Sequence, residues 1–152
     1  MLILRPIKES DTDNIIKWRN SPEVLDYFID KEVLTREKHL NWLNEYVFKN
    51  KVIQYIISYN NQDCGTIFLK NFMEEEKVAE IGIFLYGSDV KGKGIGKECI
   101  KIMTKEAFEK FGFSRVFCRI LEDNIPSNKA FKSCGYKEIK RNKGIIFYEF
   151  KQ

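Results

Sequence analysis

The chain has 152 residues, of which 43% are hydrophobic and 32% charged, and its formal net charge is +4. This balance excludes a disordered chain and suits one globular domain, which we place at residues 1–152. The basic residues are interleaved with acidic ones, so the concentrated basic patch of a dedicated nucleic-acid binder is missing, and we expect no nucleic-acid partner.

Cysteine spacing and hydrophobic runs narrow the class further. Cys64, Cys99, Cys118 and Cys134 form no CxxC pair, and His39 has no cysteine near it in sequence, so we expect no metal site. Free thiols are typical of a reducing compartment, and we therefore expect a cytoplasmic protein. The first residues do not resemble a signal peptide. No run approaches the ~20 apolar residues of a membrane span, so we expect no membrane association.

Hydrophobic periodicity divides the first half of the chain into helices and strands. Apolar residues at helical spacing, such as Leu40, Leu43 and Val47, indicate helices, whereas β-branched and aromatic runs indicate strands. The first helix is expected to end at Ser21–Pro22. In chain order we expect a strand over 2–7, helices over 11–20 and 35–48, and strands over 52–59, 64–72 and 78–86.

The second half begins with a glycine-rich segment and a long amphipathic helix. After that segment we expect a helix over 97–111, a strand over 115–121, a helix over 126–135 that Gly135 ends, and strands over 136–140 and 144–150. The complete order, β-α-α-β-β-β-α-β-α-β-β, predicts a mixed α/β domain.

The glycine-rich segment "DVKGKGIGKE", residues 89–98, admits three phosphate-binding interpretations. A P-loop requires Ser or Thr after the lysine to bind Mg²⁺, and Gly94 stands there instead. The dinucleotide fingerprint requires GxGxxG, whereas the spacing here is GxGxG. The third interpretation needs only a strand, a glycine turn and a helix start, whose backbone N–H groups and partial positive charge bind a pyrophosphate. A loop that merely turns the chain is the alternative without a ligand.

Two segments together resemble the GNAT superfamily of N-acetyltransferases. The pattern [Q/R]-x-x-G-x-[G/A], after a strand and opening a long helix, is similar to the acetyl-CoA site of that family, with Lys91 at the Gln/Arg position. The segment "NIPSNKAFKSCGY", residues 124–136, and the opening "ILRPI" are similar to other parts of the family. The resemblance implies a mostly antiparallel twisted sheet of about six or seven strands. Helices would flank this sheet, and a splayed strand pair would form the acetyl-CoA cleft.

The resemblance also implies which residues contact acetyl-CoA, the expected cosubstrate. The backbone N–H of Phe84 would face the acetyl oxygen, Leu85 and Tyr86 would follow the pantetheine arm, and Asn124 would contact that arm or fix its loop. The pyrophosphate and its surroundings would be bound by one continuous run, made of Lys91, Gly92, Lys93, Gly94, Ile95, Gly96 and Lys97.

The expected chemistry is direct attack of an amine on the thioester in a ternary complex. Glu80, eleven positions before Lys91, matches the placement of the family's general base and would act through a water; the alternative is a solvated carboxylate beside an acidic run. Many members carry Tyr where this chain has Phe131, which cannot donate a proton. Ser127 is the expected donor to the departing thiolate, and a serine that only caps a helix is the alternative.

The segments "WRNSPEV" and "TREKHLNWL" resemble two family branches with different acceptors. One branch acetylates a nucleotide-linked amino sugar, which we favour as a 4-amino sugar, and the other acetylates protein N-termini, as the ribosomal-protein enzymes do. The residues expected to bind the acceptor are Trp18, Arg19, Asn20, His39 and Trp42. For Trp18 the alternative is core packing, which its helical spacing favours; for Arg19 it is a contact with a carboxylate of the fold, and for His39 an exposed helix surface. A non-catalytic acyl-CoA-binding domain remains the alternative to an enzyme, and either would be a monomer or a homodimer.

Overall fold

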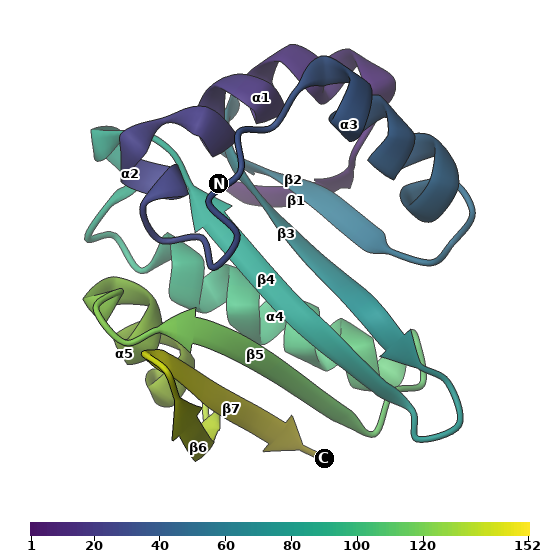
Figure 1. The fold of residues 1–152 in the computed structure, drawn as a ribbon, viewed down its shortest axis with the longest axis vertical. Coiled ribbons are helices and arrows are strands. Elements are labelled where there is room, and N and C mark those ends of the chain that lie inside the picture. The colour runs from purple at the N-terminus through teal and green to yellow at the C-terminus, as the bar shows by residue number, and fades with distance from the viewer.

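A computed structural model describes all 152 residues and contains one seven-stranded sheet (Figure 1). The strand order across the sheet is β1-β2-β3-β4-β5-β7-β6. All neighbouring strands are antiparallel except β4 and β5. The strands are β1 Leu2–Pro6, β2 Ile53–Tyr59, β3 Gln62–Met73, β4 Val78–Leu85, β5 Arg115–Leu121, β6 Lys137–Asn142 and β7 Ile145–Lys151.

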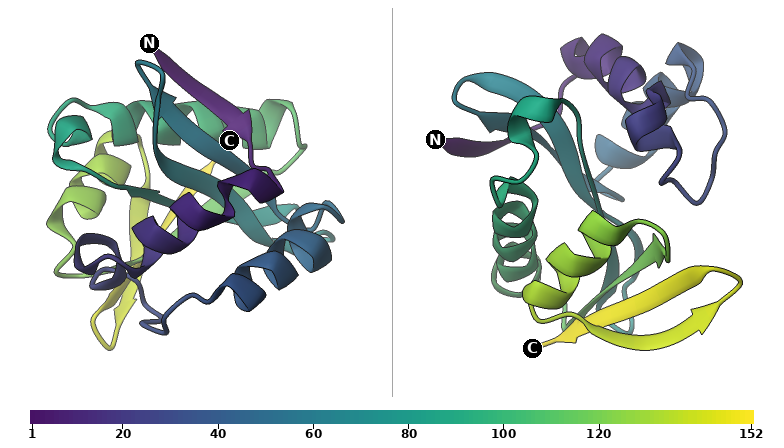
Figure 2. Two further views of the ribbon diagram at one scale, coloured as in Figure 1. Left: turned by 90° about the horizontal axis from the view of Figure 1, so that it is seen from above. Right: turned by 90° about the vertical axis from the view of Figure 1, so that its left-hand side faces the viewer.

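Helices cover both faces of this sheet. Figure 2 shows the N-terminal helices on one face, and α4 and α5 on the other. None of the helices combines the length and the apolar composition that a bilayer crossing requires. The helices are α1 Thr12–Asn20, α2 Pro22–Leu25, α3 Arg36–Trp42, α4 Ile95–Glu109 and α5 Ile125–Ser133, with one π-helical turn over Leu43–Val47 and 3-10 turns over Glu9–Asp11 and Ser88–Val90.

The pairing of β4 with β5 is unusually short. Only three residue pairs join these parallel strands, and the last of them is Glu80 with Phe117. Beyond Glu80 the two strands diverge, while β4 continues to pair with β3 as far as Leu85. The backbone edge of β4 that faces β5 is therefore unpaired from Ile81 onward, as the splayed strand pair expected from the sequence requires.

Two apolar clusters hold the layers together. The larger contains 20 buried residues and lies between the sheet and α4, with Ile81, Cys99 and Met103 among its members. The smaller lies under α1 and α3, around Trp18 and Leu43. Because side chains alternate along a strand, β4 contributes Ile81 to the first cluster and packs Phe84 against the second.

The predicted order of elements is confirmed, with local differences at helix ends. Pro22 ends α1 as expected, but it also occupies the first turn of the short helix α2. The helix α4 begins at Ile95 rather than at residue 97, because Gly94 takes a left-handed conformation with φ of 74° and serves as the N-cap. Gly135, with φ of 93°, follows α5 as predicted.

Candidate functional site

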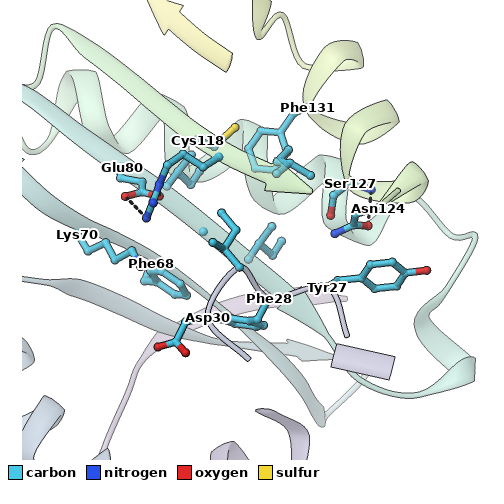
Figure 3. Close-up of a pocket in the computed structure, with 16 residues that line it drawn as sticks. Tyr27, Phe28, Asp30, Phe68, Lys70, Glu80, Cys118, Asn124, Ser127 and Phe131 are labelled. Atoms are coloured by element: carbon cyan, nitrogen blue, oxygen red, sulfur yellow. Dashed lines mark hydrogen bonds and ion pairs between the residues drawn. The ribbon is translucent and has the colours of Figure 1, made fainter. Parts of the chain in front are cut away.

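A cavity of about 230 Å³ lies where β4 and β5 part. It is lined by the loop that follows α2, by β3, β4 and β5, and by the start of α5. Figure 3 shows Lys70, Glu80 and Asp30 toward one end, and Ser127, Asn124 and Tyr27 toward the other. The splayed strands thus bring together side chains that are up to about 100 positions apart in sequence, roughly the scale of a whole domain.

Glu80 lies at the first end of the cavity and is only 5% exposed. Its Oε2 accepts from Nε of Arg119 at 2.9 Å, and its Oε1 accepts from Nδ2 of Asn71 at 2.8 Å and Nη2 of Arg119 at 3.3 Å. The alternative of a solvated Glu80 is therefore wrong, because Arg119 of β5 and Asn71 near the end of β3 cover the carboxylate. Three donors leave about one lone-pair site of the carboxylate for a water or an amine.

Ser127 and Asn124 lie at the other end of the cavity, at the N-terminus of α5. Oδ1 of Asn124 accepts from the Ser127 N–H at 3.4 Å and so caps the helix. The Ser127 hydroxyl makes no hydrogen bond within the protein and lines the cavity, so it remains available to a ligand. Phe131 lines the same wall one helical turn later and is 2% exposed.

Asn128 fixes this end of the cavity and is not among the residues expected from the sequence. Its Nδ2 donates to the carbonyls of Leu121 and Asn124 at 3.1 and 2.8 Å, and its Oδ1 accepts from the Tyr148 hydroxyl at 2.5 Å. The side chain thereby joins β5, the start of α5 and β7. A second asparagine four positions after Asn124 is the only local signal of this role.

The glycine segment forms an open cradle at the start of α4. Gly92 and Gly94 both have φ of 74°, and a Cβ on either would meet no atom within 4 Å. The N–H of Glu98 donates to the carbonyl of Gly94 and begins the helical hydrogen bonding, which leaves the preceding N–H groups of Ile95, Gly96 and Lys97 without a helical partner. An open surface with free N–H groups at a helix start suits a pyrophosphate.

The lysines around this cradle differ in their partners. Lys91 forms an ion pair at 2.9 Å with Glu23 of α2, and this contact lowers the pKa of the Glu23 carboxyl below its usual range. Glu23 also accepts from the Gly87 N–H at 3.4 Å. Lys93 and Lys97 are exposed and form no ion pair. The Lys91–Glu23 ion pair therefore connects the glycine-rich segment to α2, whereas Lys93 and Lys97 are free to contact an anion.

The register of β4 changes the expectation for the Phe84 backbone. The N–H of Tyr86 donates to the carbonyl of Cys64 at 2.7 Å, on the β3 side. Backbone groups alternate sides along a strand, so the Phe84 N–H also points toward β3, where Thr66 is its partner. Ile83 and Leu85 instead direct their N–H and carbonyl groups toward the gap. The unpaired edge of β4 is thus formed by residues one position away from Phe84.

Three of the five residues expected to bind the acceptor are buried or bonded in the N-terminal layer. Trp18 is 4% exposed, with its ring 6.4 Å from that of Tyr86. The alternative of an exposed His39 is wrong: the residue is 2% exposed, and burial lowers the pKa of its imidazole. Nε1 of Trp42 donates to Gln54 at 2.8 Å. These three side chains do not line the cavity.

Asn20 and Arg19 instead shape the loop that lines the cavity. The Asn20 side chain donates to the carbonyl of Leu34 at 2.8 Å and accepts from its N–H at 2.7 Å, which closes the loop. Nη2 of Arg19 donates to the carbonyl of Asp30 at 2.9 Å, and its guanidinium lies 3.6 Å from the ring centroid of Phe28. Phe28 and Asp30 line the cavity, so Arg19 acts on it indirectly.

Two cavity features were missed from the sequence. Lys70 pairs directly with Glu80 across β3 and β4, and the Phe68 ring lies against Gly82 so closely that a Cβ there would meet it at 2.5 Å. A glycine inside a strand is a signal of such a close approach. The Lys70 position could not be recognised because it depends on the register between the two strands.

Sequence comparisons connect the whole arrangement to known proteins. A family model described as "Acetyltransferase (GNAT) domain" matches residues 1–137. An N-acetyltransferase 9-like protein of Caenorhabditis briggsae is 35% identical over 149 residues, covering 90% of this chain and 75% of that protein. An uncharacterized protein of Methanocaldococcus jannaschii is 30% identical over 144 residues, covering 93% of this chain. The chain spans only 29% of the length of that second relative.

Solved structures share the fold at lower identity. Spermidine N-acetyltransferase from Vibrio cholerae, in complex with CoA and spermine, has a TM-score of 0.88 at 15% identity, covering 99% of this chain and 95% of that one. RimL, a ribosomal L7/L12 alpha-N-protein acetyltransferase in complex with coenzyme A, has a TM-score of 0.81 at 16% identity, covering 99% and 93%. At these identities the likeness shows the fold alone.

Proposed function

The chain belongs to the GNAT family of N-acetyltransferases, and on that premise we propose that it transfers the acetyl group of acetyl-CoA to a primary amine. The observation that carries the proposal is the parting of β4 and β5 after three residue pairs. The parting leaves an unpaired strand edge that runs from the glycine cradle toward a cavity containing Glu80 and Ser127.

The residues present fit acetyl-CoA along this path. The N–H groups of Ile95, Gly96 and Lys97 face an open cradle that a side chain at Gly94 would fill. The unpaired N–H and carbonyl groups of Leu85 suit a pantetheine arm, which carries amides of its own. When bound, acetyl-CoA would supply an acetyl thioester to the cavity.

The side chains of the cavity then divide the proton transfers between them. The attacking amine must be neutral, and Glu80 has about one free lone-pair site through which a water could pass the amine's proton. At the opposite end, Ser127 holds a hydroxyl proton with no acceptor inside the protein, and the leaving sulfur requires a donor. An N–H on the open edge of β4 is the donor for the developing oxyanion.

We propose a nucleotide-linked 4-amino sugar as the acceptor. Polyamines are disfavoured because the cavity holds Lys70 and Arg119 as well as the two carboxylates, Asp30 and Glu80. The Arg119 guanidinium already neutralises Glu80, so no surplus of negative charge remains to bind a polycation. A protein N-terminus is the alternative acceptor, because it too presents a single amine.

Mass spectrometry of acetylated products tests the proposal. The purified chain is incubated with acetyl-CoA and, in parallel, a nucleotide-linked 4-amino sugar, the corresponding sugar lacking the amine, an N-terminal peptide of a ribosomal protein, and spermidine. Acetylation of the amino sugar alone supports the proposed acceptor, and acetylation of the peptide instead supports the alternative. Absence of any acetylated product, with acetyl-CoA binding retained, would show a non-catalytic acyl-CoA-binding domain.

A further inference from the structure

We propose that Lys70 binds an anionic group of the acceptor, a carboxylate or a phosphate, at the end of the cavity opposite Ser127. This inference rests on the proposed function, since it specifies the class of amine that the same cavity accepts. Lys70 lies on β3 directly opposite Glu80 of β4, and both side chains line the cavity (Figure 3). The proposal follows from an imbalance of charge at this end.

The carboxylate nearest to Lys70 is already neutralised by another residue. Glu80 accepts two hydrogen bonds from Arg119 and one from Asn71. The Lys70 ammonium, in contrast, forms neither an ion pair nor a hydrogen bond, and its closest recorded contact with an aromatic ring places Nζ 5.5 Å from the centroid of Phe68. Lys70 is thus the cation in the cavity without a fixed partner.

The surrounding groups do not supply the missing anion. Asp30 lies on the exposed loop and already accepts from the Glu32 N–H at 3.0 Å. Arg19, behind the same loop, adds another positive charge, and its Nη1 is buried without a partner. The charged groups that act on Lys70 are two cations, Arg19 and Arg119, and two carboxylates, Asp30 and Glu80. With Lys70 itself, this end of the cavity contains three cations and two carboxylates. One positive charge is left over.

Burial makes this surplus charge unfavourable in the absence of a ligand. Loss of hydration lowers the pKa of the Lys70 ammonium below its usual range, and the nearby carboxylates offset this effect only in part. An anion that entered the cavity would restore the lost interaction, and a charge-assisted hydrogen bond of this kind is stronger than a neutral one. The acceptor would then have its anionic group toward Lys70 and its amine between the two ends of the cavity, within reach of a water bound to Glu80.

The distance along β4 is consistent with a ligand lying between the two ends. Glu80, opposite Lys70, and Phe84 are four residues apart, which is roughly 13 Å of extended strand. A molecule with an amine and an anionic group at its two ends would span part of this length. A bare amine would leave Lys70 without a partner.

Matched acceptors that differ only in one anionic group test the inference. The first pair is glucosamine 6-phosphate and glucosamine, and the second is a pair of tetrapeptides with Asp or Asn at the second position. Binding to the chain in the presence of coenzyme A is measured by calorimetry, and acetyl transfer from acetyl-CoA is measured in parallel. Wild type is compared with Lys70→Met, Lys70→Arg and Lys70→Glu, and with Lys49→Met, which changes an exposed lysine paired with Glu45.

We expect wild type to prefer the anionic member of at least one pair by about tenfold in affinity. Lys70→Met should abolish the preference, Lys70→Arg should keep most of it, Lys70→Glu should reverse it, and Lys49→Met should leave it unchanged. A preference in the phosphate pair alone points to a phosphorylated sugar, and one in the peptide pair alone to an acidic N-terminus. Equal affinities within both pairs, or a preference that survives in Lys70→Met, would overturn the inference.

The two readouts separate this inference from the proposed function. Binding that depends on Lys70 without any acetyl transfer would support the anion site and contradict the transferase. Transfer to both members of each pair at equal rates, unaffected by Lys70→Met, would support the transferase and contradict the anion site.

Discussion

At the scale of single residues, the two ends of the cavity have different kinds of polar group. Ser127 keeps a hydroxyl without a partner in the protein, whereas Glu80 is held by Arg119 and Asn71. A group that donates or accepts a proton must have a free position for it. Ser127 has that freedom, and Glu80 retains it only in part. Substitutions at the two ends should therefore affect different quantities.

Ser127→Ala tests the proposed proton donor. Loss of the hydroxyl should lower kcat by about 100-fold, as for a lost general acid, while acetyl-CoA affinity is retained. Steady-state kinetics at saturating acetyl-CoA measure both quantities. Ser133→Ala is the matched control, because the Ser133 hydroxyl at the far end of α5 only donates to the carbonyl of Ala130. An unchanged kcat in Ser127→Ala would remove this residue from the mechanism.

Arg119→Met tests whether Glu80 depends on its ion pair for stability. The change leaves the Glu80 carboxylate, whose side chain is only 6% exposed, with Asn71 as its one donor. It should lower the free energy of unfolding by about 2 kcal/mol, which is less than for a fully buried pair because the Arg119 side chain is 34% exposed. Urea denaturation measures the loss.

Arg141→Met is the control for this prediction. Arg141 pairs with Glu138 at 2.7 Å on exposed β6, so its loss should cost less than about 0.5 kcal/mol. Equal losses in the two variants would mean that the burial of Glu80 adds nothing to the strength of its pair.

At the scale of elements, the start of α4 and the packing of α3 can be examined separately from the chemistry. Gly94 and Gly112 flank α4, have φ of 74° and 75°, and leave open space where a Cβ would stand. They share the same backbone strain but differ in position. His39 of α3 is the chain's only histidine, and it is buried against the N-terminal layer.

Gly94→Ala should weaken coenzyme A binding by more than its effect on stability suggests. The left-handed conformation costs an alanine about 1 kcal/mol, and the new Cβ would occupy the cradle at the start of α4. Gly112→Ala carries the same strain at the other end and should bind coenzyme A normally. Calorimetry of both variants compares the affinities. Similar affinities would show that the cradle does not contact the ligand.

His39 should make stability depend on pH below neutrality. Burial lowers the pKa of the folded-state imidazole below the usual 6.5, so the unfolded chain binds the proton more readily. Stability is therefore fully present above about pH 6.5, and it falls by up to about 1.4 kcal/mol per pH unit as the pH drops toward the folded-state pKa. Urea denaturation from pH 7.5 to 5.5 measures the slope. His39→Leu should flatten it, and the same slope in both proteins would contradict the prediction.

The elements themselves could be predicted because their signals are local. The spacing of Leu40 and Leu43, and the glycines at 92 and 94, report on neighbouring residues alone. The sequence does not predict which N–H and carbonyl groups of β4 point toward β3 and which toward β5. This depends on the register with which β3 pairs with β4. A shift of one position exchanges the two sides of a strand, so the place expected for the Phe84 backbone belongs to Ile83 and Leu85.

The polar contacts of the site were hidden for a related reason. Arg119 and Glu80 are 39 positions apart, and Lys91 and Glu23 are farther apart still. No local pattern joins such pairs, and either partner alone has the appearance of a solvated charge. The sequence leaves a ligand role and a core role open for Trp18, and it favours a ligand role for Trp42, because an aromatic residue on a helix has the same sequence pattern in a core as in a binding site.

At the scale of the whole molecule, the sheet has one strand pairing with few hydrogen-bonded residue pairs, the pairing of β4 with β5. Six strand contacts hold the seven strands, and the β4–β5 contact contains only three residue pairs. A ligand that reaches from the start of α4 along β4 to α5 would contact elements on both sides of the short β4–β5 pairing. Its binding energy should therefore appear as stability of the entire fold.

Acetyl-CoA should raise the melting temperature, and Mg-ATP should not. At a ligand concentration about 100 times the Kd, stabilisation is about 2.7 kcal/mol, which corresponds to roughly 5–10 °C for a chain of this size. Differential scanning fluorimetry measures the shift. Stabilisation by Mg-ATP alone would instead support the P-loop interpretation of the glycine segment.

The short β4–β5 pairing also separates two blocks of strands that are synthesised one after the other. Strands β1 to β4 come from residues 2–85, and β5 to β7 come from residues 115–151. The pairings among β1, β2, β3 and β4 require no residue of the second block, because each of these strands pairs with its neighbour in sequence. A nascent chain that ends before β5 thus already presents the β4 edge and, once α4 has formed, the glycine cradle, while the acceptor cavity is completed only when the last quarter of the chain arrives.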